Sequence, residues 1–338
     1  MKKFLLLAIE SSCDDTAVAI IDENSCVLAD IVYGQNIAHA PFGGVVPEIA
    51  SREHLQQIPQ AVAAAFEAAH IKAQDLCAIA VTSGPGLVGS LLIGVQFARG
   101  LAQSLGIPLM GIHHIEGHLM ASSASEEFPR EPFIALIASG GHSALYLCHG
   151  QCRYELLGET KDDAAGEAFD KSAKLLGLGY PGGRVIDELA QKGDSLLFKF
   201  PIAFRTSKSV DYSFSGLKTS FRLLVQKLQA EGHDLSGQLL FDLCASVQKA
   251  VVDALVAKAF LACEQQNIKH LVLGGGVAAN SALRAAALAQ GKKRGIQVLV
   301  PEKAHCTDNA VMIALAAKNR LDLGLVQEFK LNANASLG

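Results

Sequence analysis

The feature that most constrains the fold is a pattern that occurs twice along the chain. Residues 4–9 form an apolar run typical of a buried strand, residues 11–16 are polar, and residues 17–21 are apolar again. The same order of apolar, polar and apolar segments recurs within residues 133–147. Each half of the chain is therefore predicted to contain a hairpin with a polar tip.

A second pattern repeats downstream of each hairpin. In the first half, a predicted strand at residues 76–81 leads through the glycine-rich loop 82–89 into a predicted helix. In the second half, residues 270–273 lead through loop 274–280 into another helix. A duplication with so long a period indicates two homologous α/β lobes. The predicted helices cover residues 53–69, 90–104, 236–265, 281–289 and 309–321, and the last is expected to return to the first lobe.

The glycine loops suggest what such lobes would bind. Loops at the carboxyl ends of strands in open α/β sheets form ligand sites, and amides at helix N-termini attract anions. We therefore expect a cleft between the lobes that takes a phosphorylated ligand.

Length and composition agree with two folded lobes. The chain has 338 residues, above the roughly 250–300 at which single cores stop growing. Half of the residues are hydrophobic and 18% are charged, which excludes a disordered chain. We expect residues 1–125 with 308–338 to form the first lobe and 126–307 the second. The net charge of −4 means that any contact with nucleic acid needs a local basic patch or a partner.

The sequence favours a cytoplasmic protein without a membrane span. The apolar run 4–9 stops at Glu10, too early for a secretion signal, and the apolar stretch 86–98 is far shorter than a bilayer requires. The eight cysteines show no CxxC spacing, so free buried thiols are the favoured interpretation.

Two histidines form the first candidate site. His114 and His118 are four residues apart, so on a helix both would face one side, as metal ligands or as core histidines. Asp308 is a candidate third ligand, although an acid at a helix start is also a common N-cap. Two imidazoles and one carboxylate leave coordination positions open, as in catalytic iron or zinc sites. The zinc-protease pattern HExxH is absent, and Glu116 falls on the wrong helix face to serve as its base.

Three carboxylates occupy the first hairpin tip. Glu10, Asp14 and Asp15 could hold a divalent cation, act as a base, or simply be solvated.

Ten motifs taken together resemble one known family, the universal tRNA N6-adenosine threonylcarbamoyltransferases, once described as O-sialoglycoprotein endopeptidases. They run in family order from residue 4 to about residue 320. They are ESSCDD at 10–15, GGVVPE at 43–48, SGPGL at 83–87, HHIEGH at 113–118, SGGH at 139–142, DDAAGEAFDK at 162–171, YPGG at 180–183, SFSGLK at 213–218, GGVAAN at 275–280 and CTDN at 306–309.

The resemblance implies a fold and a reaction. The fold is the two-lobed α/β fold of actin, Hsp70 and sugar kinases, a duplicated ribonuclease-H-like domain with a cleft between the lobes. The reaction transfers a threonylcarbamoyl group from threonylcarbamoyl-AMP to N6 of adenosine 37 in tRNAs that read codons beginning with A (t6A37), releasing AMP. The implied partners are tRNA, an inactive paralogue that forms a heterodimer, a P-loop ATPase subunit and the synthase that supplies threonylcarbamoyl-AMP.

The resemblance also assigns residues. It implies one divalent metal ion, iron or zinc with Fe²⁺ favoured, bound by His114, His118 and Asp308. Asp14 is our candidate for deprotonating the attacking amine. The adenylate would be bound by Ile137, Ala138, Ser139, Gly140, Gly141, Asp170, Gly183, Asp187 and Asn280.

Small departures from the family pattern leave the metal ligands untouched. Many members carry Thr, Thr, Asp, Pro and Gly where this chain has Ser11, Ser143, Gly179, Arg184 and Ala310. Arg184, beside Gly183, could alter the sugar pocket.

The sequence alone leaves two alternative functions and the role of two basic clusters undecided. The alternatives are a metallopeptidase and a non-catalytic, actin-like nucleotide-binding scaffold. Two basic clusters are candidate tRNA contacts or ordinary solvated faces: Arg205, Lys208, Lys218 and Arg222, and separately Lys292, Lys293 and Arg294.

Overall fold

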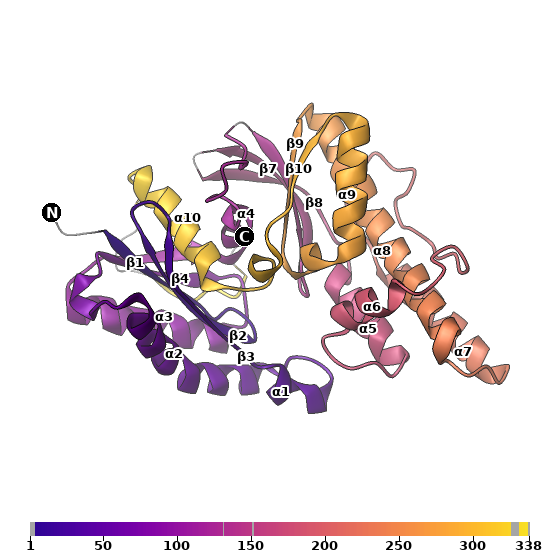
Figure 1. Ribbon diagram of the computed structural model, residues 1–338, viewed down its shortest axis with the longest axis horizontal. Coiled ribbons are helices and arrows are strands. Elements are labelled where there is room, and N and C mark those ends of the chain that lie inside the picture. The colour runs from indigo at the N-terminus through magenta and orange to yellow at the C-terminus, as the bar shows by residue number, and fades with distance from the viewer. Residues whose placement is uncertain (1–3, 131, 151, 326–330, 337–338) are drawn as a thin grey trace. The chain divides into compact units, whose positions relative to one another are not determined.

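The computed structural model describes residues 4–130, 132–150, 152–325 and 331–336 (Figure 1). These residues form two compact units. The first runs to Phe128 and resumes at Asp308, and the second comprises Pro129–Thr307. The described part of each unit contains a five-stranded sheet.

The sheet of the first unit is mixed. The strand β1 (Leu5–Glu10) pairs antiparallel with β2 (Asp15–Asp22), which pairs antiparallel with β3 (Val27–Gly34). On its other side β1 runs parallel to β4 (Ala78–Gly84), and β4 runs parallel to β5 (Leu109–His113). Every residue of β1 and β4 is buried, which explains why residues 5–9 and 78–81 are unbroken apolar runs.

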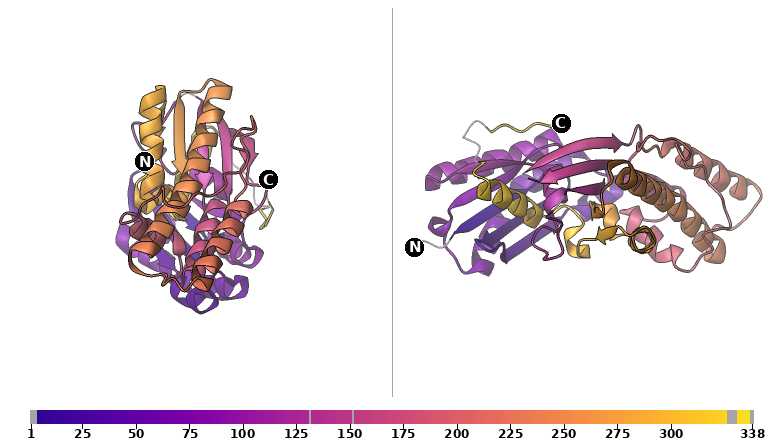
Figure 2. Two further views of the ribbon diagram at one scale, coloured as in Figure 1. Left: turned by 90° about the vertical axis from the view of Figure 1, so that its right-hand side faces the viewer. Right: turned by 90° about the horizontal axis from the view of Figure 1, so that it is seen from above.

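Helices cover both faces of this sheet. Side chains alternate across a strand, so the odd-numbered residues of β1 lie in one core with α2 (Pro47–Ala69) and α3 (Val88–Leu105). The even-numbered residues lie in a second core with α10 (Ala310–Asp322). Figures 1 and 2 show α10 lying across β1 and β2, on the face opposite α2 and α3. The shorter helices of the unit are α1 (Asn36–His39), η1 (Ala40–Phe42), η2 (Ala73–Asp75) and α4 (His114–Met120).

The second unit repeats this arrangement. In its sheet β6 (Phe133–Ala138) pairs antiparallel with β7 (Ser143–Gly150), and β7 with β8 (Arg153–Glu159). On the other side β6 runs parallel to β9 (His270–Gly274), and β9 to β10 (Gln297–Leu299). The order β8-β7-β6-β9-β10 matches β3-β2-β1-β4-β5 strand for strand, so the predicted duplication is confirmed.

A helical layer builds the core of the second unit. The longest helix of the described residues, α8 (Gly237–Gln266), is buried along much of its length and packs against α6 (Gly182–Ala190) and α9 (Ser281–Arg294). The core of the second unit includes the large side chains Phe169, Tyr212, Phe221 and Phe260. The helices are α5 (Ala165–Leu175), α6 (Gly182–Ala190), α7 (Ser215–Ala230), α8 (Gly237–Gln266), η3 (Gly276–Ala279), α9 (Ser281–Arg294) and η4 (Lys303–His305).

Some predicted boundaries were wrong. The first long helix begins at Pro47 rather than at residue 53, because proline suits the first helical position, where an amide would have no partner. The helix predicted to end at residue 289 continues to Arg294 and stops before Gly295, whose φ of 64° is left-handed.

Two further expectations concern cysteines and membranes. None of the eight cysteines, all within the described residues, forms a disulfide; four are buried, three are intermediate, and Cys26 is exposed, against the expectation of burial. Within the described residues, no helix combines the length and the apolar character that crossing a bilayer requires.

Candidate metal centre and substrate-binding residues

A strand-to-helix junction positions the two histidines. Strand β5 ends at His113, and α4 begins with His114. The His113 ring accepts a hydrogen bond at Nδ1 from the Ile115 amide (3.1 Å), which caps the helix. One turn later His118 falls on the same side of α4 as His114, and the two side chains are only 1% and 5% exposed.

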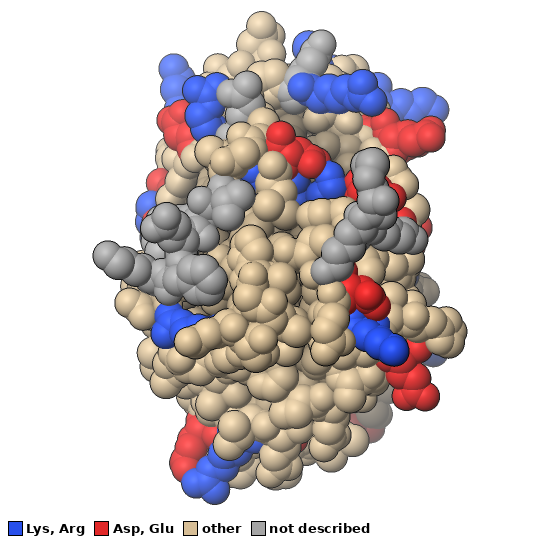
Figure 3. Space-filling model, turned by 90° about the vertical axis from the view of Figure 1, so that its left-hand side faces the viewer, with Lys and Arg blue, Asp and Glu red and all other residues tan. Residues whose placement is uncertain are grey.

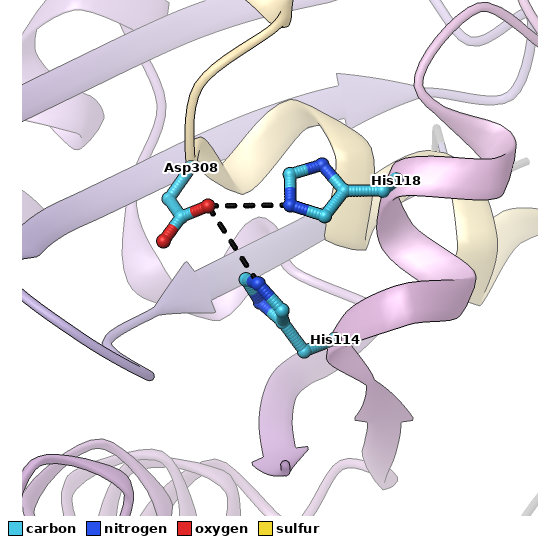
Figure 4. A group of neighbouring side chains, drawn as sticks. All are labelled: His114, His118 and Asp308. Atoms are coloured by element: carbon cyan, nitrogen blue, oxygen red, sulfur yellow. Dashed lines mark ion pairs between the residues drawn. The ribbon is translucent and has the colours of Figure 1, made fainter. Parts of the chain in front are cut away.

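Asp308 completes a group of three. Its Oδ1 lies 3.6 Å from His114 Nε2 and 3.3 Å from His118 Nε2 (Figure 4). One ligand atom from each residue lies within 4.8 Å of the other two, so a single ion can contact all three. Asp308 is not the cap of α10, because the Asn309 side chain accepts the Met312 amide (2.9 Å) and performs that role. Its carboxylate is thereby available to the histidines.

His118 supplies the test of whether a cation fits. Neither of its ring nitrogens has a hydrogen-bond partner among the described residues, although both are buried. Apart from the 3.3 Å contact of Nε2 with Asp308, nothing among the described residues binds the lone pairs of this buried imidazole, and an imidazole without hydrogen bonds costs free energy. A metal ion at Nε2 would remove that cost, and the donor set of two imidazoles and a carboxylate suits iron or zinc.

Glu10 contacts the ring nitrogen of His114 that faces away from Asp308. The Glu10 carboxylate, at the end of β1 and fully buried, lies with Oε2 3.1 Å from His114 Nδ1. Thr82 Oγ1 donates to the same oxygen (2.6 Å), and the Ser12 amide donates to Oε1. A carboxylate can only accept, so His114 carries its proton on Nδ1 and presents Nε2 to Asp308. Sequence reasoning placed Glu10 in an acidic tip but missed this role.

The local electrostatics favour a positive charge in this pocket. Burial alone would lower the pKa of His114, but Asp308 and Glu10 raise it to about 9. Burial alone would raise the pKa of Glu10, yet His114 and the Thr82 hydrogen bond bring it below its ordinary value. Without a metal the group therefore holds a proton, and a dication binding there would displace it.

The two other acids of the hairpin tip are poised differently. Burial and the nearby Asp308 charge raise the pKa of Asp15 to about 8. Burial likewise raises the pKa of Asp14 above its ordinary value, although less. A carboxyl group that titrates near neutral pH is suited to proton transfer.

Glu116 is unavailable as a catalytic base. It is buried, and both of its oxygens accept hydrogen bonds from Arg320 on α10, one at 2.9 Å to Nε. This ion pair stabilises the packing of α4 on α10. The metallopeptidase alternative requires a base beside the histidines, so the pairing disfavours it.

The predicted adenylate residues all belong to the second unit. Ile137 and Ala138 end β6, and the following turn is closed by Ser139, whose amide donates to the His142 carbonyl (2.7 Å). Gly140 and Gly141 are exposed, with nothing within 4 Å of where a Cβ would lie. Their backbone is thus accessible to a ligand.

Three other predicted residues contact or cap the starts of helices: Asp170 in α5, Asp187 in α6 and Asn280. Asp170 Oδ1 accepts the Gly182 amide (2.8 Å) at the start of α6. Asp187 accepts the amide and hydroxyl of Ser281 (2.9 and 2.6 Å), while Asn280 caps α9. These side chains organise two helix N-termini, and each oxygen of the Asp187 carboxylate has a second lone pair for a further donor.

Two more residues bear on this region. Gly183 is partly exposed, and a Cβ added to it would have Phe169 Cβ, 3.8 Å away, as its nearest neighbour. Arg184 beside it donates from Nε to Glu188 (2.9 Å) in an exposed pair along α6. In this conformation the Arg184 side chain is engaged by its own helix.

Comparison with known proteins decides the family. The family model of the tRNA N6-adenosine threonylcarbamoyltransferases matches residues 26–315. The chain is 50% identical over 331 residues to the enzyme of that name from Anaeromyxobacter dehalogenans (strain 2CP-C), covering 97% of this chain and 98% of that protein. It is 47% identical over 337 residues to the one from Clostridium perfringens (strain 13 / Type A), covering 100% and 98%. The chain belongs to this family. The resemblance drawn from the ten motifs is confirmed, and membership in a family of transferases disfavours the scaffold alternative.

Solved structures agree on the fold. HypF in its phosphate- and nucleotide-bound form has a TM-score of 0.60 at 14% identity, covering 95% of this chain and 47% of that one. The Acidaminococcus fermentans (R)-2-hydroxyglutaryl-CoA dehydratase component A has a TM-score of 0.55 at 16% identity, covering 94% and 99%. At such identities the likeness shows the fold alone, and it confirms the predicted actin- and Hsp70-like class.

Proposed function

We propose that this chain transfers the threonylcarbamoyl group of threonylcarbamoyl-AMP to N6 of adenosine 37 in tRNA. In this reaction a bond forms between N6 and the carbamoyl carbon, and the bond from that carbon to the phosphate oxygen breaks. AMP leaves with the electron pair, and N6 loses one proton. The observation that carries the proposal is the group of two buried histidines, His114 and His118, with Asp308, in a chain about half identical to enzymes of this name along its whole length.

The metal ligands would be His114, His118 and Asp308. The His118 ring, which makes no hydrogen bond among the described residues, and the fixed tautomer of His114 support this assignment. The ion would be iron or zinc, with Fe²⁺ favoured. When bound, it supplies a Lewis acid that binds and polarises the threonylcarbamoyl group.

Residues of the second unit would bind the adenylate. The open backbone at Gly140 and Gly141 supports close approach of a nucleotide. Asp170 and Asp187 would accept hydrogen bonds from ribose hydroxyls, and amides nearby would stabilise the departing AMP. The remaining proposed contacts are Ile137, Ala138, Ser139, Gly183 and Asn280.

Asp14 would accept the proton that N6 loses. Burial raises the pKa of Asp14 above its ordinary value, which makes its carboxylate a stronger base. Asp15, whose pKa is about 8, is the alternative base.

The partners beyond tRNA are also proposals: an inactive paralogue, a P-loop ATPase and the synthase of threonylcarbamoyl-AMP, all in the cytoplasm. In the face shown in Figure 3, the middle is occupied mainly by residues other than Lys, Arg, Asp and Glu, and the charged residues lie mainly near the edge. The first unit exposes Leu55 on α2 and Val88 and Leu92 on α3. Exposed apolar side chains of this kind suit a protein partner.

Reconstitution tests the proposal. The purified chain, its protein partners, threonylcarbamoyl-AMP and tRNA should yield t6A, detected by mass spectrometry of digested nucleosides. His118→Ala should abolish it, while His149→Ala, at an exposed histidine of β7 in the second unit, should not. Absence of t6A with the unaltered chain would refute the function, and full product from His118→Ala would refute the metal assignment.

A further inference from the structure

Two separate parts of the chain bring basic residues to the same end of α8. The loop that contains Arg205 and Lys208 is fastened to this end, because Gln265 Nε2 donates to the Lys208 carbonyl (2.6 Å). From the other side, the last turn of α9 reaches α8 through Arg294, which pairs with Glu264 and lies 5.3 Å from the Phe260 ring centroid. The helix therefore joins clusters that the sequence presented as separate.

The loop is firmly held. The Lys258 ammonium, 4% exposed on α8, donates to the carbonyls of Phe204 (2.7 Å), Ser207 (3.0 Å) and Ser209 (2.5 Å). Three hydrogen bonds from one buried cation fix the backbone on both sides of Lys208. The exposed Lys208 side chain is therefore attached to a backbone that is held in place.

Lys269 extends the same surface. It directly precedes β9, and its carbonyl accepts the Gln297 amide (2.8 Å) at the start of β10, just after α9 ends. We call the exposed side chains gathered here the basic surface: Arg205, Lys208, Lys269, Lys292, Lys293 and Arg294.

The basic surface has almost no compensating charge. Segments 204–209, 264–270 and 290–297 contain these six basic residues and a single acid, Glu264, which is paired with Arg294. Within the described part of the chain, Lys208, Lys269, Lys292 and Lys293 have no ion pair. Cations in the last turn of a helix stabilise its C-terminus, and this applies to the three basic residues of α9 but not to Arg205, Lys208 or Lys269.

Lys218, from the cluster predicted with Lys208, has a different environment. It pairs with Asp163, which also pairs with Lys171 (2.9 Å). Its charge is neutralised inside the second unit, so it does not belong to the basic surface.

We propose that the basic surface binds the phosphate backbone of the tRNA, which rests on the proposed function. The whole chain carries a net charge of −4, yet this surface has six basic residues and one acidic residue. Such a local concentration of positive charge attracts an anionic partner. The surface lies at the amino ends of β9 and β10, and the proposed adenylate residues follow the carboxyl ends of β6 and β9. The five residues of β9 span about 17 Å, roughly half a turn of a double helix, so one RNA hairpin can reach both ends.

A charge-neutralising pair of substitutions tests the basic surface. In Lys292→Ala/Lys293→Ala, both changes lie in an exposed helical turn where alanine is well tolerated. The matched control is Lys227→Ala/Lys249→Ala, which removes the same charge from an exposed lysine of α7 and a partly buried lysine of α8 that pair with Glu231 and Asp253. The affinity of each full-length protein for tRNA is measured between about 50 and 200 mM salt.

The expected result is a change in salt dependence. Each phosphate contact adds about 0.9 to the slope of log affinity against log salt, so the Lys292→Ala/Lys293→Ala slope should be shallower by about 1.8. Over this fourfold range the unaltered protein should then lose roughly tenfold more affinity than the variant. The control should match the unaltered protein.

The other outcomes overturn the proposal. Equal slopes for both pairs would show that only total charge matters. Unchanged tRNA binding with loss of a protein partner would assign the surface to that protein. Formation of t6A at saturating tRNA is measured separately, so failure of the proposed reaction would be visible in the unaltered protein and would not be confused with failure of the surface.

Discussion

Glu10 Oε2 lies 3.1 Å from His114 Nδ1, and neither side chain is accessible to solvent beyond a few per cent. This contact connects the end of β1 with the start of α4 and sets which nitrogen of His114 faces Asp308. Glu10 is thus a positioning residue, acting on the proposed metal through the imidazole.

Replacing Glu10 with Gln should weaken metal binding while preserving the shape of the pocket. An amide can donate as well as accept, so it no longer requires the proton on His114 Nδ1. We expect affinity for Zn²⁺ or Fe²⁺ to fall roughly 10- to 100-fold, as is common for partners of metal-bound histidines. Chelator competition would measure it. Thr82→Val, which removes only one hydrogen bond to Glu10, should have a smaller effect; metal affinity equal to that of the unaltered protein in Glu10→Gln would contradict the role of Glu10.

His118→Ala should separate metal binding from folding. Since its ring nitrogens have no hydrogen-bond partners among the described residues, this change breaks no hydrogen bond there in the metal-free protein. It should abolish the metal-dependent stabilisation, which reaches about 2.7 kcal/mol at a metal concentration about 100 times Kd. Thermal unfolding with metal and with chelator would measure both effects.

The matched control for that experiment is His54→Ala. His54 is also fully buried, but its ring contacts Thr16 Oγ1 (2.7 Å) and the Cys13 carbonyl (3.0 Å). This substitution should destabilise the metal-free protein by about 1–3 kcal/mol and leave the metal response intact. A metal response that survives in His118→Ala would remove His118 from the ligand set.

The sequence predicted the duplicated sheet because its central strands are long apolar runs separated by polar tips. It did not predict β3, β8 or β10. The strands β3 and β8 are half exposed and mix polar with apolar residues, and β10 has three residues, too few for a periodic signal. Their place in the sheets depends on pairing with strands already formed.

The histidine pair was visible from its spacing, whereas the Glu10 contact was not. The spacing of His114 and His118 is local, but Glu10 and Asp308 reach them only through tertiary folding. One signal was available: Glu10 continues the even-numbered series of β1, and those residues face α10. To predict which of the three acids at the hairpin tip contacts His114, one would also need to know on which face of the sheet α4 lies.

The raised pKa of Asp15 should make the metal-free protein less stable as pH rises. The folded state holds this proton up to about pH 8, whereas the unfolded chain releases it near 3.8. The resulting stabilisation is complete below about pH 4 and is lost as pH rises towards 8, by at most about 1.4 kcal/mol per pH unit. Asp15→Asn should flatten this dependence. Urea midpoints from about pH 5 to 8 in the presence of EDTA would measure it, and identical slopes in both proteins would contradict the assignment.

Gly275 and its neighbour Gly276 form a matched pair for testing the second glycine loop. Gly275 has φ of 84°, and a Cβ there would lie 2.4 Å from the carbonyl oxygen of Ala138, itself one of the proposed adenylate residues. Neither the backbone conformation nor the space admits alanine, so Gly275→Ala should reduce the free energy of unfolding by at least about 2 kcal/mol. At Gly276 the nearest atom to such a Cβ is Thr307 Cγ2 at 3.9 Å, so Gly276→Ala should change stability by no more than about 0.5 kcal/mol. Urea unfolding would measure the free energy of unfolding of both variants. If the two were equally stable, the loop would be able to move away from Ala138 without loss of stability, and the prediction would be wrong.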